Sequence, residues 1–253
     1  MLKLTDTRNF KKPFILLSKI KNYFKLKKEF KKFKKLSDEV GARFPVKWEN
    51  IFFISGDSTN NTEFDAHYVY HPAWAARILE KTKPQKHIDI SSTLHFCSIV
   101  SAFIPIDFYD YRPAFLNLSN LNSKRGDLTS LPFEDSSVES ISCMHAIEHI
   151  GLGRYGDPLD PDGDLKAIKE LKRVTAKDGS LIFVVPVRQP KIMFNAHRIY
   201  SYNQVIGYFD DFELKQFALI PDNATISGII LEATKNQADK QGYGCGCFWF
   251  QKK

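Results

Sequence analysis

The feature that most constrains the fold is a regular alternation of short apolar segments and helical patterns that begins at residue 87. The segments 87–90, 106–109, 124–128, 138–144 and 180–185 have the length and character of strands. Apolar residues at helical spacing mark 96–103 and 165–174, and the second of these ends before Asp178-Gly179. Strands that alternate with helices, several of them as continuous apolar runs, predict an α/β fold with a mostly parallel sheet covered on both faces.

Two late strands, at 212–219 and 247–251, follow without a clear helix between them. This arrangement predicts an antiparallel pair at one edge of the sheet. The main domain is therefore expected at 84–253. Residues 37–83 are expected to form a connector with a short strand at 48–55 and a helix at 71–81. That helix is predicted to begin at Pro72, because proline is favoured in the first turn of a helix.

Polar side chains stand at the carboxyl ends of the predicted strands, where open α/β sheets bind their ligands. An acid after the second strand can hold the two hydroxyls of a ribose, and a polar side chain after the third can bind an adenine amino group. Groups after the first strand can hold an amino-acid moiety. The residues at these ends are, in chain order, Asp89, Ser91, Ser92, Asp110, Asp127, Leu128 and His145.

Two longer segments carry a family resemblance. Residues 126–149 read GDLTSLPFEDSSVESISCMHAIEH, and residues 170–186 read ELKRVTAKDGSLIFVVP. Both resemble the central motifs of class I S-adenosylmethionine-dependent methyltransferases. The run HIGLGRYGDPLDPDGD at 149–164 is similar to an uncharacterised bacterial branch of this superfamily, whose members tend to be encoded near surface-polysaccharide genes. The resemblance covers residues 84–253.

The resemblance implies a Rossmann-like methyltransferase sheet, S-adenosylmethionine as cofactor and a sugar or surface-glycan precursor as methyl acceptor. It assigns Asp110 to the ribose and Asp127, with Leu128, to the adenine. The methionine end is assigned to the loop after Asp89, through Ser91 and Ser92, and to His145.

One departure from the family pattern lies in the loop after the first strand. The family usually has Asp-x-Gly-x-Gly there, and this chain reads Asp89-Ile-Ser-Ser-Thr. The alternative hypothesis is therefore a non-catalytic protein with a closed cofactor site that serves membrane-associated glycan assembly.

Residues past the fifth strand and in the loop at 154–164 are candidates for the acceptor side. His197 is the preferred general base, because an imidazole pKa of about 6.5 suits deprotonation of a hydroxyl near neutral pH. His149 is the competing base. Arginines suit an anionic acceptor such as a uronic acid or a nucleotide sugar. The substrate-binding candidates are Arg154, Asp157, Arg188, Asn195 and Arg198.

A metal-dependent hydrolase is a lesser alternative. His145-x-x-Glu148-His149 matches the His-x-x-Glu-His pattern of some zinc peptidases. That chemistry needs both histidines on one face of a helix, whereas His145 directly follows an apolar strand, and no third ligand is obvious. Cys245 and Cys247 form a single pair and are expected to be ordinary buried residues. No metal site is predicted.

Residues 1–36 form a basic arm. Between Arg8 and Leu36 there are twelve lysines and arginines against one acid, Glu29, and Phe or Leu side chains recur at helical spacing. Such a helix suits an anionic membrane surface, and the alternatives are packing on a protein surface or binding nucleic acid. No nucleic-acid partner is expected. Without a secretory signal or a disulfide framework, the protein is expected in the cytoplasm, peripherally at the inner face of the membrane.

Overall fold

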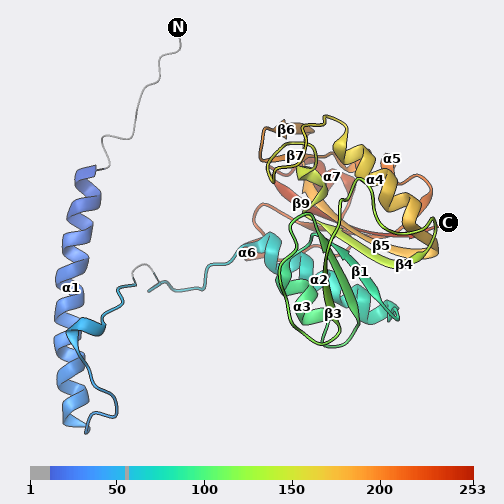
Figure 1. Ribbon diagram of the computed structural model, residues 1–253. Coiled ribbons are helices and arrows are strands. Elements are labelled where there is room, and N and C mark those ends of the chain that lie inside the picture. The colour runs from blue at the N-terminus through green and yellow to red at the C-terminus, as the bar shows by residue number, and fades with distance from the viewer. Residues whose placement is uncertain (1–11, 55–56) are drawn as a thin grey trace. The chain divides into compact units, whose positions relative to one another are not determined.

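The computed structural model describes the backbone of residues 12–54 and 57–253, and the side chains from Ile20 onward except in the same gap. The chain divides into two compact units, one up to Glu63 and one from Phe64 to Lys253 (Figure 1). The boundary places residues 64–83, which were expected in the connector, with the α/β unit. None of the described helices is long and apolar enough to cross a membrane.

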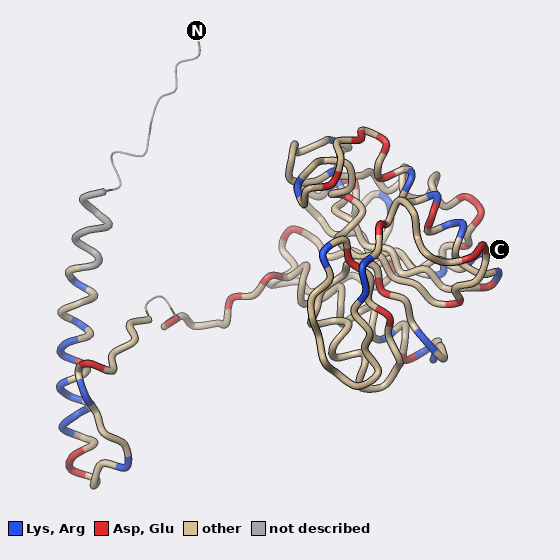
Figure 2. Tube along the Cα trace, in the orientation of Figure 1, with Lys and Arg blue, Asp and Glu red and all other residues tan. Residues whose placement is uncertain are grey.

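The first unit consists of the helix α1 (Lys12–Glu39) and a following segment with the short 3-10 helix η2 (Trp48–Asn50). Lysines line α1 along its described length (Figure 2). The Trp48 ring packs edge-on against Phe30, with ring centroids 5.0 Å apart. Residues 51–54 have no regular structure, so the strand predicted at 48–55 is wrong over the described residues; Ser55 lies outside them. Residues 1–11 of the predicted arm also lie outside them.

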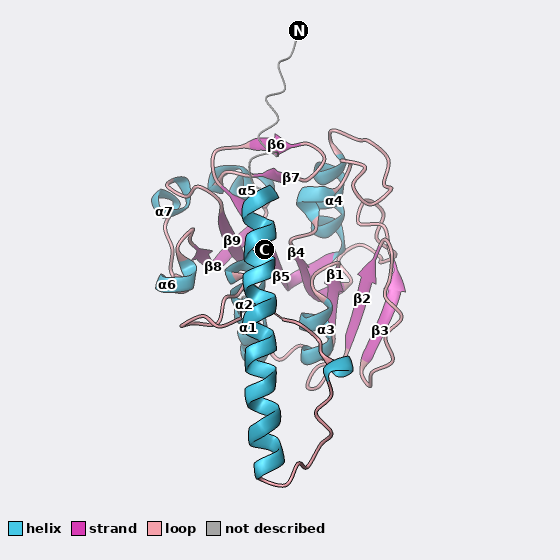
Figure 3. Ribbon diagram, turned by 90° about the vertical axis from the view of Figure 1, so that its left-hand side faces the viewer, coloured by secondary structure: helices cyan, strands magenta, loops and turns pink. Residues whose placement is uncertain are grey.

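A seven-stranded sheet forms the second unit, in the order β3-β2-β1-β4-β5-β9-β8. The first five strands of that order run parallel, and β1, β2 and β3 lie side by side in Figure 3. The order reverses between β1 and β4, as in doubly wound folds. The parallel strands are β1 (His87–Ile90), β2 (Ile106–Asp110), β3 (Leu121–Arg125), β4 (Val138–Met144) and β5 (Thr175–Val187).

The sheet ends in an antiparallel pair. Strand β9 (Gly244–Lys252) runs antiparallel between β5 and the edge strand β8 (Phe212–Ile220). This confirms the predicted fold class: an α/β fold with a mostly parallel sheet and antiparallel strands at one edge. Strand β4 spans the predicted residues, and β3 ends before Gly126, upstream of the predicted 124–128.

Helices cover both faces of the sheet, as predicted. The helices α2 (Ala66–Thr82) and α3 (Leu94–Val100) pack on one face through residues that include Trp74 and Phe96. On the other face, α4 (Gly163–Val174), α5 (Tyr202–Tyr208) and α7 (Lys235–Asp239) contribute Leu171, Val205 and Ala238 to a second apolar cluster. The short helix α6 (Ala224–Ser227) joins the first face.

Helix α2 begins earlier than predicted. Its N-cap is Asp65, whose side chain accepts a hydrogen bond from the backbone N–H of Tyr68 at 3.3 Å, and Pro72 lies inside the helix rather than at its start. The extra turn carries His67 and Tyr68. A small hairpin, β6 (Lys191–Met193) with β7 (His197–Ile199), and the 3-10 helix η3 (Ile147–His149) were also not predicted.

Candidate active site

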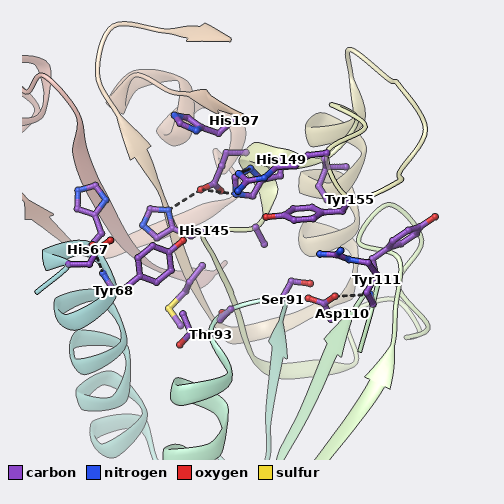
Figure 4. Close-up of a pocket in the computed structure, with 18 of the residues that line it drawn as sticks. His67, Tyr68, Ser91, Thr93, Asp110, Tyr111, His145, His149, Tyr155 and His197 are labelled. Carbon is purple, nitrogen blue, oxygen red and sulfur yellow. Dashed lines mark hydrogen bonds and ion pairs between the residues drawn. The ribbon is translucent and has the colours of Figure 1, made fainter. Parts of the chain in front are cut away.

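Two adjoining cavities lie at the carboxyl ends of the parallel strands. The larger has a volume of about 580 Å³ and is lined from the ends of β1, β2 and β4, the start of α2, and His197 and Tyr243 (Figure 4). The smaller, about 130 Å³, lies past β3 and includes Asp127 and Leu128. The two share lining residues: Ser91, Tyr111, His149, Ile150 and Tyr155.

The loop after β1 keeps a glycine-like backbone although it has no glycine. Ser91 has a φ of +53°, in the left-handed region that favours glycine. Its backbone N–H and hydroxyl both donate to the carbonyl of Tyr109, at 2.8 and 3.2 Å. Thr93 caps α3 by accepting from the N–H of Phe96. The hydroxyl of Ser92 is buried and has no hydrogen-bond partner among the described residues, and both serines line the larger cavity.

The two acids after β2 and β3 lie where the sequence predicted them. Asp110 lines the larger cavity, and its Oδ1 accepts from the backbone N–H of Arg112 at 2.7 Å. Asp127 lines the smaller cavity, and its Oδ1 accepts from the N–H and the hydroxyl of Thr129 at 2.8 and 2.7 Å. The buried side chain of Leu128 forms an apolar wall of that cavity.

Asp89 does not line either cavity, which corrects its prediction as a direct cofactor ligand. It is fully buried within β1, and its Oδ1 accepts from Ser142 Oγ at 2.6 Å. Ser142 Oγ lies 2.8 Å from His87 Nε2, and His87 Nδ1 lies 2.8 Å from Ser140 Oγ. Burial raises the pKa of Asp89 to about 7, while the hydrogen bond from Ser142 acts in the opposite direction.

The end of β4 brings three titratable side chains together. His145 has a φ of +54°, and its Nδ1 lies 2.9 Å from Glu148 Oε1. Burial alone would raise the pKa of Glu148, but the hydrogen bond from His145 and the charges of His145 and His149 lower it overall. The second oxygen of Glu148 is buried without a partner in the described part of the chain. Glu148 is thus an ionised carboxylate with one free oxygen at the cavity.

His149 and His197 both line the larger cavity, with ring centroids 6.4 Å apart. His149 Nδ1 donates to the carbonyl of Ala196 at 2.6 Å, a carbonyl that also accepts from Arg154 at 3.0 Å. Burial lowers the pKa of both histidines below the usual value. The Nε2 of His197 is buried and unpartnered among the residues described. Both imidazoles are therefore neutral at pH 7 and able to accept a proton.

The predicted substrate residues divide into two groups. Arg154 and Asp157 reach the cavities, but Asp157 accepts hydrogen bonds from the N–H groups of Gly151, Gly153 and Tyr155 and so shapes its own loop. Arg188, Asn195 and Arg198 line neither cavity, which corrects their assignment.

Arg198 is buried and faces inward. It donates to the carbonyls of Ile150, Asp160 and Pro161 and pairs with Asp164 at 3.4 Å. Its role is to hold the loop at 150–164 in place.

Several lining residues were missed from the sequence. His67 and Tyr68 come from the first turn of α2 and Tyr243 directly precedes β9, so none follows a parallel strand. Tyr155 lines both cavities. The guanidinium carbons of Arg112 and Arg154 lie 4.5 and 5.1 Å from the centroid of its ring. The spacing His67-x-x-x-His71 is a sequence signal that two histidines share one helix face.

The pattern His145-x-x-Glu148-His149 does not form the site of a zinc peptidase. His149 lies in η3 rather than on an α-helix with His145, and its Nδ1 donates to the carbonyl of Ala196. Among the described residues, the group with metal-ligand spacing is instead His67, His145 and Cys245. This group shares only His145 with the residues of the metal-dependent hydrolase alternative.

Comparisons with known proteins concern mainly the fold. A family model described as "Caenorhabditis protein of unknown function, DUF268" matches residues 133–235. No curated protein matches the sequence. Solved structures similar to the chain include the YcgJ protein from Bacillus subtilis (16% identity, 72% of this chain and 99% of that one, TM-score 0.49). A TehB-like SAM-dependent methyltransferase from Corynebacterium glutamicum has 15% identity, with 73% and 89% covered and a TM-score of 0.46.

Proposed function

We propose that this protein is an S-adenosylmethionine-dependent methyltransferase whose cofactor lies across the two cavities. The observation that carries the proposal is the adjoining pair of cavities past the point where strand order reverses, with Asp110 in the larger and Asp127 and Leu128 in the smaller. In this arrangement Asp110 holds the ribose hydroxyls, and the adenine lies against Leu128. The larger volume, about 580 Å³, suits a small-molecule site.

Unpartnered polar atoms support a polar ligand in the larger cavity. Ser92 Oγ, Glu148 Oε2 and His197 Nε2 are all buried, lack hydrogen-bond partners among the described residues, and belong to lining residues. Buried polar groups are rarely left unpaired, so a ligand that supplies these contacts fits the site. The ionised Glu148 carboxylate is complementary to a cationic sulfonium.

In this proposal the chain's residues bind the acceptor and take its proton. The bound cofactor would supply an electrophilic methyl group. His197 Nε2 accepts the proton of the acceptor hydroxyl, with His149 as the competing base, because both neutral imidazoles face the cavity. His145 and Glu148 hold each other's orientation through their hydrogen bond. Positioning of the two reactants contributes most of the rate.

The acceptor is proposed to carry negative charge. Arg112 and Arg154 flank the Tyr155 ring at the cavity, and both guanidiniums are on exposed residues. Two arginines suit a uronic acid or a nucleotide sugar, consistent with the glycan precursor that the family resemblance implies.

Cofactor binding by an Asp110 variant tests the proposal. Asp110→Ala removes charge-assisted hydrogen bonds to two hydroxyls, so we expect S-adenosylmethionine to bind roughly 100-fold more weakly by equilibrium dialysis. Asp135→Ala is the matched control, because Asp135 is exposed, pairs with Arg173 and lines neither cavity. Equal affinity of the two variants would contradict the ribose assignment. Absence of binding to the folded wild-type chain would favour the non-catalytic alternative.

For the arm, we propose peripheral binding to an anionic membrane surface at its cytoplasmic face. Ile20 and Phe24, one turn apart on the same face of α1, are 46% and 64% exposed among lysines, the combination that lets a helix lie in the headgroup region. With phosphatidylserine vesicles, Ile20→Ser/Phe24→Ser should reduce co-sedimentation of the full chain about tenfold or more. Phe115→Ser, at an exposed residue of the second unit, should have no effect. Wild-type-like sedimentation of the double variant would contradict the proposal.

A further inference from the structure

Three side chains from distant parts of the sequence meet at one wall of the larger cavity. His67 lies in α2, His145 follows β4 and Cys245 lies in β9, and one ligand atom from each falls within 4.8 Å of the others. The His67 and His145 rings are stacked, with centroids 5.6 Å apart. Both histidines line the cavity, and Cys245 is fully buried behind them.

The surroundings of His145 orient one of its nitrogens toward the thiol. Its Nδ1 donates to the Glu148 carboxylate at 2.9 Å, and its Nε2 lies 3.3 Å from Cys245 Sγ. A carboxylate that accepts from the far nitrogen of a ligating imidazole is a recurrent arrangement around protein-bound zinc. His145 also holds a left-handed backbone conformation, φ +54°, which is costly for a residue with a side chain.

The spacing of one donor pair agrees with that of a tetrahedral zinc ion. Zinc bonds of about 2.0–2.1 Å to nitrogen and about 2.3 Å to sulfur place two such donors roughly 3.5 Å apart. The observed separation of His145 Nε2 and Cys245 Sγ is 3.3 Å. Two imidazoles with one thiolate form a set that favours zinc over magnesium or calcium, which prefer oxygen ligands.

A third histidine lies against this group. His71 follows His67 by one helical turn, and its ring centroid is 5.0 Å from that of His145. Its Nδ1 donates to the carbonyl of His67 at 2.6 Å, which leaves Nε2 as an acceptor. That Nε2 is buried and has no partner in the part of the chain described. One imidazole nitrogen beside the group, His71 Nε2, therefore accepts no hydrogen bond from the described residues.

We infer that His67, His145 and Cys245 bind a divalent ion of the zinc class, with the remaining coordination position on the cavity side. Binding displaces the proton of the Cys245 thiol, because the thiolate is the metal ligand. The inference concerns a metal site alone and holds whether or not the protein transfers methyl groups. Without metal, the same thiol and imidazole form only a hydrogen bond.

Metal loading of the full chain tests this inference. The tag-free protein is dialysed against zinc sulfate and then buffer, and bound zinc is measured by mass spectrometry. We expect about one zinc per wild-type chain, and an affinity at least about 100-fold lower for His67→Ala and for Cys245→Ser. Cys97→Ser is the matched control, because Cys97 is a buried free cysteine of α3 outside the group, and it should bind like wild type.

Cobalt substitution keeps the test valid if Cys245→Ser folds poorly. Cobalt bound to the wild-type chain should show a thiolate-to-metal charge-transfer band in the near ultraviolet, and His67→Ala should weaken that band while its circular dichroism stays native. Substoichiometric zinc in the wild type, equal zinc in the His67 and Cys97 variants, or a cobalt spectrum without the band would each overturn the site.

Discussion

Replacing Arg198 with alanine is expected to lower the free energy of unfolding by about 3–5 kcal/mol, because it breaks a buried ion pair from one side. Arg198 is 5% exposed and pairs with Asp164, which is also 5% exposed. The carboxylate keeps one neutral donor, the hydroxyl of Tyr200 at 2.9 Å. Three carbonyls of the loop at 150–164, those of Ile150, Asp160 and Pro161, lose their guanidinium donor as well.

Urea unfolding of Arg198→Ala and Arg188→Ala separates this structural role from substrate binding. Arg188 comes from the same stretch after β5, lines neither cavity and is only half-buried, so its loss should change stability by less than about 0.5 kcal/mol. A stable Arg198→Ala protein that has lost only acceptor binding would show that Arg198 contacts the substrate after all.

The second large effect concerns pH. The pKa of Asp89 is raised by burial from the ordinary 3.8 to about 7, so the unfolded chain ionises this carboxyl more readily than the folded one. The stability that the folded state has with Asp89 protonated is therefore fully present below pH 4, and it is lost as the pH rises through 7 and the buried carboxyl ionises. A shift of three units corresponds to about 4 kcal/mol. Asp89→Asn cannot ionise, and should be more stable than wild type at pH 8.

Thermal unfolding at pH 5 and pH 8 measures this difference, with Asp107→Asn as the matched control. Asp107 is buried in β2 but pairs with Lys86 and Lys124 at 2.7 and 2.8 Å, and hydrogen bonds from these lysines and from Asn122 outweigh its burial and lower its pKa. Its variant should be less stable than wild type at pH 8, the opposite sign. An Asp89→Asn protein that is destabilised equally at both pH values would contradict the raised pKa.

Strands with continuous apolar character could be predicted closely from the sequence, and weakly apolar ones could not. All but one residue of β4 is buried, and its bounds match the prediction residue for residue. The edge strand β3 has a single fully buried residue, Leu121, so no apolar run marks it and its predicted position was displaced. The start of α2 was displaced for a different reason: the capping side chain of Asp65, rather than Pro72, sets it.

The residues of the site likewise divide into those that could be predicted from the sequence and those that could not. Residues directly after parallel strands could be placed from the sequence, because strand order alone puts their ends at one edge. The prediction for Arg198 failed since an arginine after a strand has the same pattern whether it faces a ligand or a buried carboxylate. His67 and Tyr243 could not be found, because His67 stacks on His145 and Tyr243 stacks on His67, and these are contacts between residues far apart in sequence.

A crystal structure of the full chain soaked with S-adenosylhomocysteine tests the central claim most directly. We expect one ligand molecule to occupy both cavities. Both ribose hydroxyls should lie within hydrogen-bond distance of the Asp110 carboxylate, and the adenine should lie against Leu128. The amino-acid end should then satisfy Ser92 Oγ, which is otherwise buried without a partner among the described residues. Density for the ligand elsewhere, or side chains of the loop after β1 filling the space at saturating ligand, would contradict the cofactor site.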